Sequence, residues 1–254
     1  AAARRATWRG TMAGFVGSTQ RREWLFETQA DIDAVRNKAR EVYLAKSTSE
    51  REPLSPSAEA GFLNLYLALM RKLCTRKDLN PCLTEAKYSQ RVYLSAAALF
   101  KRFYLKHSVM AVNPKLMSSV AIFVASKVVE LPLPSNKGLR GIEVEALAKL
   151  AKLHPSLIVD NEIRFLSGID FQMYVHHANG PFEGFLSQLE TAKPEHGAIW
   201  ASMRTFGNAF LEETLSTDAS FLYPPSRIAF AALLDAAAMT REQTGDAPFA
   251  VNHL

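Results

Sequence analysis

Charged residues inside apolar stretches, thiols and paired histidines are the side chains of this sequence that could carry chemistry. Lys127 is the clearest case, because it interrupts the apolar and small-residue run LMSSVAIFVASKVVE at 116–130. An ammonium group in a helix buried on most sides needs either an opposite charge or an interface with another molecule. From the residues alone both interpretations stay open: an ion pair that serves only the fold, or a contact that binds a partner.

The two cysteines and the adjacent histidines do not form a recognisable metal or redox site. Cys74 and Cys82 lack the paired short Cys/His spacing of a zinc site or a disulfide framework, so we expect reduced thiols. The rings of His176 and His177 cannot face one metal from a regular helix, and we assign them no chemistry.

Motifs of common enzymes are missing from the sequence. It contains no Gly-rich phosphate loop, no GxSxG elbow and no HExxH or CxxC arrangement. The sequence therefore predicts a protein that is not an enzyme and that needs neither a cofactor nor a metal.

Apolar residues at helical spacing dominate the chain from about residue 57, and Pro, Gly and Asn separate the patterns. The predicted fold class is all-α. The first pattern is expected to face the core and comprises Phe62, Leu65, Tyr66, Leu69, Met70 and Leu73.

Start signals place the helices that follow. Thr84 is a suitable cap for a second helix that ends near His107, and Asn113-Pro114 combines a capping residue with proline at the first helical position. The third helix, which starts there, is apolar or small all round and belongs in the middle of a bundle. Further helices are predicted at about 28–45, 143–153 and 156–169.

The pattern then restarts, which indicates an internal repeat. A helix opens at Asn179, a longer one covers 197–215, and the segment after Pro225 repeats the small-and-apolar texture of the segment after Pro114 at an offset of 111 residues. Each unit is too large for a short solenoid repeat. We therefore expect two five-helix bundles in tandem, the second one incomplete at its C-terminal end.

Charge is distributed unevenly along the chain. The formal net charge is +5, but residues 1–22 contain five arginines and no acidic residue, and the remainder carries 25 basic and 25 acidic residues. A folded nucleic-acid-binding face would keep its positive excess within the globular body. We therefore expect no direct specific nucleic-acid binding, and residues 1–22 are interpreted as a disordered basic tail or, alternatively, an organelle transit peptide.

No apolar run approaches the roughly 20 residues that a membrane helix needs, so a membrane-spanning role is not expected.

Three segments resemble the cyclin family: LFKRFYLKHSVM at 99–110, NPKLMSSVAIFVASKVVE at 113–130 and FLYPPSRIAFAALL at 221–234. The resemblance covers about residues 18–240. Within the cyclins, STQRREWLF at 18–26, SVM at 108–110 and NGPFEGFL at 179–186 are similar to the cyclin H type, and cyclin C is the alternative. The resemblance implies two cyclin-box bundles behind an N-terminal helix, which in the cyclin H type packs on its own box and on the kinase.

The resemblance also implies domain boundaries. They are a basic tail at 1–22, an N-terminal helix and linker at 23–52, a first cyclin box at 53–175 and a second, truncated cyclin box at 176–254.

Cyclins bind a kinase through a lysine of the third helix and a glutamate of the fifth, and the resemblance maps these to Lys127 and Glu162. The two are 35 residues apart, so any pairing between them is a tertiary contact. Leu166 lies one turn beyond Glu162 on the same helix face, which predicts apolar contact area beside the charges.

Residues around Lys127 complete the predicted kinase-binding set. Val128 and Leu131 flank it, and Glu130 fits the family pattern. Val129 departs from that pattern, because cyclins commonly have an acidic residue there, and a salt bridge from this position is therefore in doubt.

The function that the resemblance implies is that of a regulatory subunit. It would bind and activate a cyclin-dependent kinase in the nucleus, together with a RING-finger assembly factor, as the CDK-activating kinase of TFIIH. That kinase phosphorylates other cyclin-dependent kinases and the C-terminal domain of RNA polymerase II. The alternatives are a cyclin C-type subunit of the Mediator kinase module and a TFIIB-like DNA-binding general transcription factor. The latter is weakened by the missing zinc ribbon and the neutral body.

Overall fold

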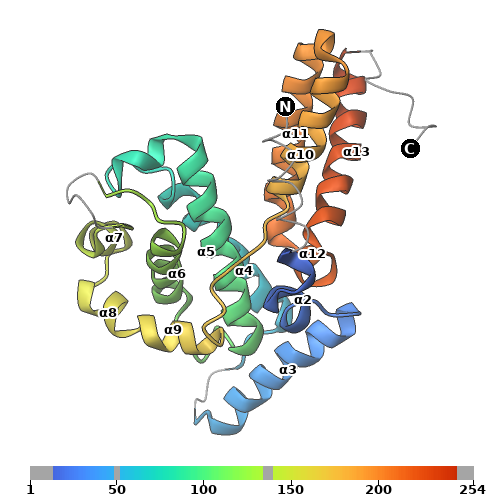
Figure 1. The fold of residues 1–254 in the computed structure, drawn as a ribbon. Helices are drawn as coiled ribbons and strands as arrows, with labels where there is room; N and C mark the ends of the chain where they lie inside the picture. Colours follow the sequence, from blue (N-terminus) through green and yellow to red (C-terminus); the bar gives the residue numbers. More distant parts are fainter. Residues whose placement is uncertain (1–13, 49–51, 134–139, 245–254) are drawn as a thin grey trace. The chain divides into compact units, whose positions relative to one another are not determined.

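The structure is a computed structural model that describes residues 14–48, 52–133 and 140–244, and it divides into two compact units (Figure 1). The central unit spans Thr28–Val175. The C-terminal unit combines the residues up to Glu27 with those from His176 onward. Extended pairing within the described ranges is limited to one isolated antiparallel bridge between Pro132 and Arg140. The predicted all-α class is confirmed.

Helices of the central unit surround α6. This helix packs against α4, α5, α7, α8 and α9, as the prediction of a mid-bundle helix requires (Figure 1). The elements of the unit are α3 (Gln29–Lys46), α4 (Pro56–Leu73), the short 3₁₀ helix η1 (Pro81–Thr84), α5 (Ala86–Lys106), α6 (Pro114–Val128), α7 (Val144–Ala151), α8 (Pro155–Asp160) and α9 (Glu162–Gly168).

The start and the packing of α6 follow from its residues. The Asn113 side chain accepts a hydrogen bond from the Lys115 backbone N–H, and proline occupies the first turn. Ala121 and Ala125 are fully buried, so neighbouring helices approach closely. The buried Ser126 hydroxyl donates to the Phe123 carbonyl at 2.7 Å, which leaves no unpaired polar group at that crossing.

The helix α4 differs from the prediction. Leu67 and Met70 are buried, but Phe62, Leu65 and Leu69 of the predicted core stripe are 42%, 53% and 41% exposed. The prediction was wrong for these three residues because α4 is apolar around much of its circumference. Periodicity then fits two overlapping faces and does not indicate which of them is buried.

Two predicted boundaries also differ. Thr84 lies in η1, where its hydroxyl donates to the Pro81 carbonyl, and α5 begins later, behind Glu85 and without a side-chain cap. The stretch predicted as one helix at 156–169 is interrupted at Asn161, whose side chain donates to the Leu157 carbonyl. The N-terminal helix predicted at about 28–45 is present as α3, with Thr28 in a capping box.

The C-terminal unit repeats the plan around a second small-residue helix. Ala232 and Ala236 of α13 are fully buried, like Ala121 and Ala125 of α6 at the offset of 111 residues. α13 packs against α10, α11 and α12. The helices of the unit are α2 (Thr19–Glu23), α10 (Asn179–Ala192), η2 (Pro194–His196), α11 (Gly197–Glu213), η3 (Thr214–Ser216), α12 (Ala219–Leu222) and α13 (Pro225–Thr244).

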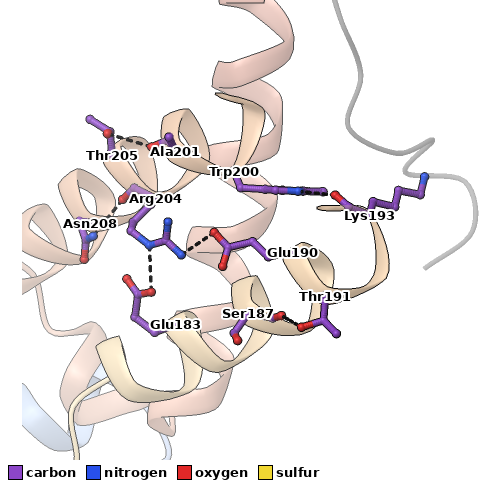
Figure 2. Close-up of polar contacts among 10 residues, drawn as sticks. All are labelled: Glu183, Ser187, Glu190, Thr191, Lys193, Trp200, Ala201, Arg204, Thr205 and Asn208. Carbon is purple, nitrogen blue, oxygen red and sulfur yellow. Dashed lines mark hydrogen bonds and ion pairs between the residues drawn. The ribbon is translucent and has the colours of Figure 1, made fainter. Parts of the chain in front are cut away.

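Polar contacts join α10 to α11 at the surface. Figure 2 shows the Arg204 guanidinium of α11 donating to Glu183 Oε2 at 3.0 Å and to Glu190 Oε1 at 2.7 Å, both on α10. The buried Trp200 indole donates to the Lys193 carbonyl at 2.8 Å and thereby fixes the turn between the two helices.

The segment before Glu27 belongs to the C-terminal unit by its contacts. The Gln20 side chain donates to the His176 carbonyl and accepts from the His176 backbone N–H, and Trp24 is 1% exposed. The Phe26 N–H donates to the Phe221 carbonyl at 2.8 Å. Of the tail predicted to be disordered, residues 1–13 lie outside the described residues. The rest differs from that prediction, because Thr19–Glu23 is helical.

None of the helices in the described part of the chain is long and apolar enough to span a membrane.

Two glycines of α11, Gly207 and Gly197, allow the packing of α11 against α10 to be tested with a matched control. A Cβ at Gly207 would lie 2.1 Å from Phe182 Cζ, and the fully buried ring has no room to move, whereas a Cβ at Gly197 meets nothing within 4 Å. We expect Gly207→Ala to lower the free energy of unfolding by about 1–3 kcal/mol through overpacking. Gly197→Ala should leave it unchanged or raise it by up to about 1 kcal/mol. Urea unfolding followed by circular dichroism measures both, and equal effects would contradict the packing.

Candidate functional site

The last turn of α6 carries Lys127 to the surface, and a C-terminal capping motif fixes its backbone there. The Leu131 N–H donates to the Ser126 carbonyl and the Glu130 N–H donates to the Lys127 carbonyl, both at 3.0 Å. Glu130 adopts a left-handed conformation with φ of 55°. These are the bonds of a Schellman motif, in which the residue that usually is glycine is here a glutamate.

The ammonium group of Lys127 has two neighbours. Its Nζ forms an ion pair with Glu162 Oε1, and it lies 4.3 Å from the centre of the Phe123 ring, one turn earlier on α6. A cation over an aromatic face is attracted by the ring quadrupole. The Lys127 and Glu162 side chains are 38% and 22% exposed, so solvent reaches the pair. The structure thus brings together the two charged residues that the sequence singled out.

Glu162 is the first residue of α9, and an apolar stripe runs beside it. Leu166 lies one turn after Glu162 on α9 and Ile163 follows Glu162 directly, while Val159 is near the end of α8, before the break at Asn161. Val159 is 47% and Ile163 66% exposed, and Leu166 is half-buried. Sequence reasoning found only Leu166. Val159 and Ile163 could have been found because they are apolar residues within three positions of Glu162 in the sequence.

The remaining predicted residues have different environments. Val128 is half-buried beside Lys127, and Glu130 is exposed. Leu131 is completely buried, so its place in the predicted contact set is corrected: its side chain belongs to the core. The physical reason is the Schellman turn, which directs the residue after the left-handed position back against the helix.

Chemical groups elsewhere offer little reactivity. Cys74 and Cys82 are free thiols, and burial raises the pKa of Cys74 to about 12, so this thiol stays protonated near neutral pH. No group of three potential metal-ligating side chains occurs among residues 14–48, 52–133 and 140–244. A surface ion pair beside an apolar stripe is suited to binding another protein.

Comparison with known proteins places this geometry in a family. The family model for the cyclin C-terminal domain matches residues 177–247. Cyclin-H of Xenopus laevis is 28% identical over 229 residues, which cover 87% of this chain and 67% of the relative. A chain in the structure of the CAK complex from Chaetomium thermophilum bound to ATP-γ-S is similar with a TM-score of 0.73 and 26% identity. That match covers 89% of this chain and 69% of the other. The chain is similar to cyclins over most of its length.

Within that family the chain is similar to cyclin H. It is also 26% identical over 234 residues to the RNA polymerase II holoenzyme cyclin-like subunit of Emericella nidulans, with coverage of 87% of this chain and 66% of that subunit. In this chain the residue of α13 that matches Lys127 is Ala238, which is exposed. The charged pair is therefore a feature of the central unit, although the helix that carries it has a counterpart.

The stability of the isolated chain separates the two interpretations left open by the sequence. We expect Lys127→Ala and Glu162→Ala each to lower the free energy of unfolding by no more than about 1 kcal/mol, because solvent screens the charges. Urea unfolding of the isolated cyclin measures this. A loss of about 3 kcal/mol or more is the size expected for a broken buried pair, and it would mean that the pair serves the fold.

Proposed function

We propose that this cyclin binds a cyclin-dependent kinase and activates it, as the regulatory subunit of the CDK-activating kinase of TFIIH. It would act in the nucleus with a RING-finger assembly factor. The observation that carries the proposal is the Lys127–Glu162 pair beside an apolar stripe, in which Val159 and Ile163 are exposed and Leu166 is half-buried. The similarities to Cyclin-H and to a chain of the CAK complex support it.

The proposed contact surface joins the end of α6 to one face of α8 and α9. An ammonium group has three donors and a carboxylate has two acceptor oxygens, and one ion pair uses only one of each. Lys127 and Glu162 can therefore also bond to backbone groups of a partner. The apolar stripe supplies area that becomes buried in the complex, and Val128 and Glu130 extend the surface at the end of α6.

Activation is a shift between two conformations of the kinase. The cyclin binds the conformation in which the mobile helix of the kinase is turned in, so that its glutamate meets the lysine that anchors ATP. Raising that conformation from about 1% to 99% requires a differential affinity of about 5.5 kcal/mol. One ion pair cannot supply this, so the apolar stripe must contribute, and the transfer of phosphate remains the work of the kinase.

A second assignment is favoured by a specific observation. The similarity to an RNA polymerase II holoenzyme cyclin-like subunit fits a cyclin C-type subunit of the Mediator kinase module. Both assignments predict the same kind of docking surface, because each partner is a cyclin-dependent kinase. They differ in the proteins that assemble with the pair.

Co-purification separates the two assignments. The tagged chain is isolated from nuclear extract of its source organism and its partners are identified by mass spectrometry. We expect a cyclin-dependent kinase with a RING-finger factor and TFIIH subunits, and kinase activity on a peptide of the RNA polymerase II C-terminal domain. Mediator subunits instead would support the second assignment. Recovery without any kinase would contradict both.

The docking surface itself is tested by affinity. We expect Lys127→Ala or Glu162→Ala to weaken binding to the purified kinase subunit by at least about 1–3 kcal/mol, about 5- to 150-fold in Kd. Each change leaves the other charge unpaired in a desolvated interface. Isothermal titration calorimetry measures the Kd.

Arg76→Ala is the control for that titration. It removes a close ion pair with Asp78, at 2.5 Å, on the loop between α4 and η1, and both side chains are about half exposed. It should leave the Kd unchanged. An unchanged Kd for the Lys127 and Glu162 variants would remove the site assignment, and a loss for the Arg76 variant would mean that the effect is not specific to the site.

A further inference from the structure

The aliphatic part of Lys127 rests against the backbone of a glycine. A Cβ at Gly141 would lie 3.0 Å from Lys127 Cγ and 3.1 Å from Ser126 Oγ, which is closer than ordinary van der Waals contact. Gly141 also has φ of +114°, a conformation that residues with a Cβ rarely adopt. Only glycine therefore lets the chain at this point approach the last turn of α6 so closely.

Asn80 holds Gly141 in place from a distant part of the sequence. Its side chain is buried, and its Nδ2 donates to the Gly141 carbonyl at 3.1 Å and to the Pro132 carbonyl at 2.9 Å. Its Oδ1 accepts from the Cys82 N–H at 2.8 Å. Both amide donors and the amide oxygen are thus bonded, so the rotamer is fixed.

A second bond ties the same glycine to the end of α6. The Gly141 N–H donates to the Leu131 carbonyl at 2.8 Å, directly after the Schellman turn. Gly141 is therefore held on its N–H side by the chain that leaves α6 and on its carbonyl side by Asn80. This backbone forms a wall along the Lys127 stem, while Glu162 and Phe123 fix the charged end.

We infer that Asn80 and Gly141 are positioning residues for Lys127 in partner binding, an inference that rests on the function proposed above. A lysine side chain loses much rotational freedom when a complex immobilises it. A stem already confined by Gly141 loses less of it on binding. Asn80, whose side chain is buried, thus contributes to kinase affinity through Lys127.

Two variants disturb the contact between Gly141 and the Lys127 stem in different ways. Gly141→Ala places a methyl group against the Lys127 stem and strains the backbone. Asn80→Ser is milder, because serine is also a good capping residue for the Cys82 N–H but cannot donate to two carbonyls. If Gly141→Ala does not fold, Asn80→Ser carries the test alone.

A double-mutant cycle with Lys127→Ala separates positioning from a general loss of structure. The Kd for the purified kinase subunit is measured for Asn80→Ser and Gly141→Ala, each with Lys127 present and with Lys127→Ala. We expect each variant to raise the Kd about 2-fold or more when Lys127 is present, and to have no effect on it in the Lys127→Ala background. Urea unfolding should show the same loss of stability for Asn80→Ser in both backgrounds. For Gly141→Ala the loss should be smaller in the Lys127→Ala background, where the contact with Lys127 Cγ is absent.

Ile228→Val is the matched control, since Ile228 is buried in the core of the C-terminal unit and shortening it lowers stability without touching the wall. It should leave the Kd unchanged in both backgrounds. Equal changes in Kd with and without Lys127 would overturn the inference while leaving the docking site standing. If Lys127→Ala alone leaves the Kd unchanged, the docking site itself fails and the inference with it.

Discussion

The packing of α6 in the middle of the central unit constrains both the fold and the site. Five helices contact it, so its side chains must be apolar or small, and the buried Ala121 and Ala125 meet that requirement. Charges are tolerated only where the helix leaves the core, which is at Lys115 in its first turn and again in its last turn. Lys127 stands there, with its stem along the Gly141 backbone and its ammonium group at the surface, facing Glu162.

Helix α13, the counterpart of α6 in the C-terminal unit, keeps the buried small residues but not the charge. Helix α13 has the same small residues at the same offset, and Ala232 and Ala236 are fully buried. In the described part of the chain it packs against α10, α11 and α12, and its opposite face, including Phe230, is exposed. With the charge replaced by Ala238, the repeated pattern preserves the helix crossing without the site. The repeated helix therefore keeps the packing of α6 but not its charged residue.

Sequence patterns predicted those parts of the fold that depend on residue type alone. The start of α6 followed from Asn113-Pro114, and its central place followed from its small residues. The buried face of α4 could not be predicted, because Phe62 and Met70 satisfy the same periodicity and only the tertiary packing separates them. The burial of Leu131 was missed for a related reason: it depends on a left-handed conformation at Glu130, a residue type that does not indicate one.

Family resemblance predicted the pairing of Lys127 with Glu162. The residues that hold the Lys127 stem could be found only in the structure. Asn80 is 47 residues from Lys127 in the sequence, and nothing in its type connects the two. In the free chain we expect the part-buried ion pair to contribute little to stability. In a complex its charges would be desolvated, and the interaction between them would be stronger. A subunit that shifts the conformation of its partner must spend little of its binding energy on ordering itself. A glycine wall fixed by a fully bonded asparagine meets that condition, because the lysine is ordered by the cyclin fold before any partner arrives.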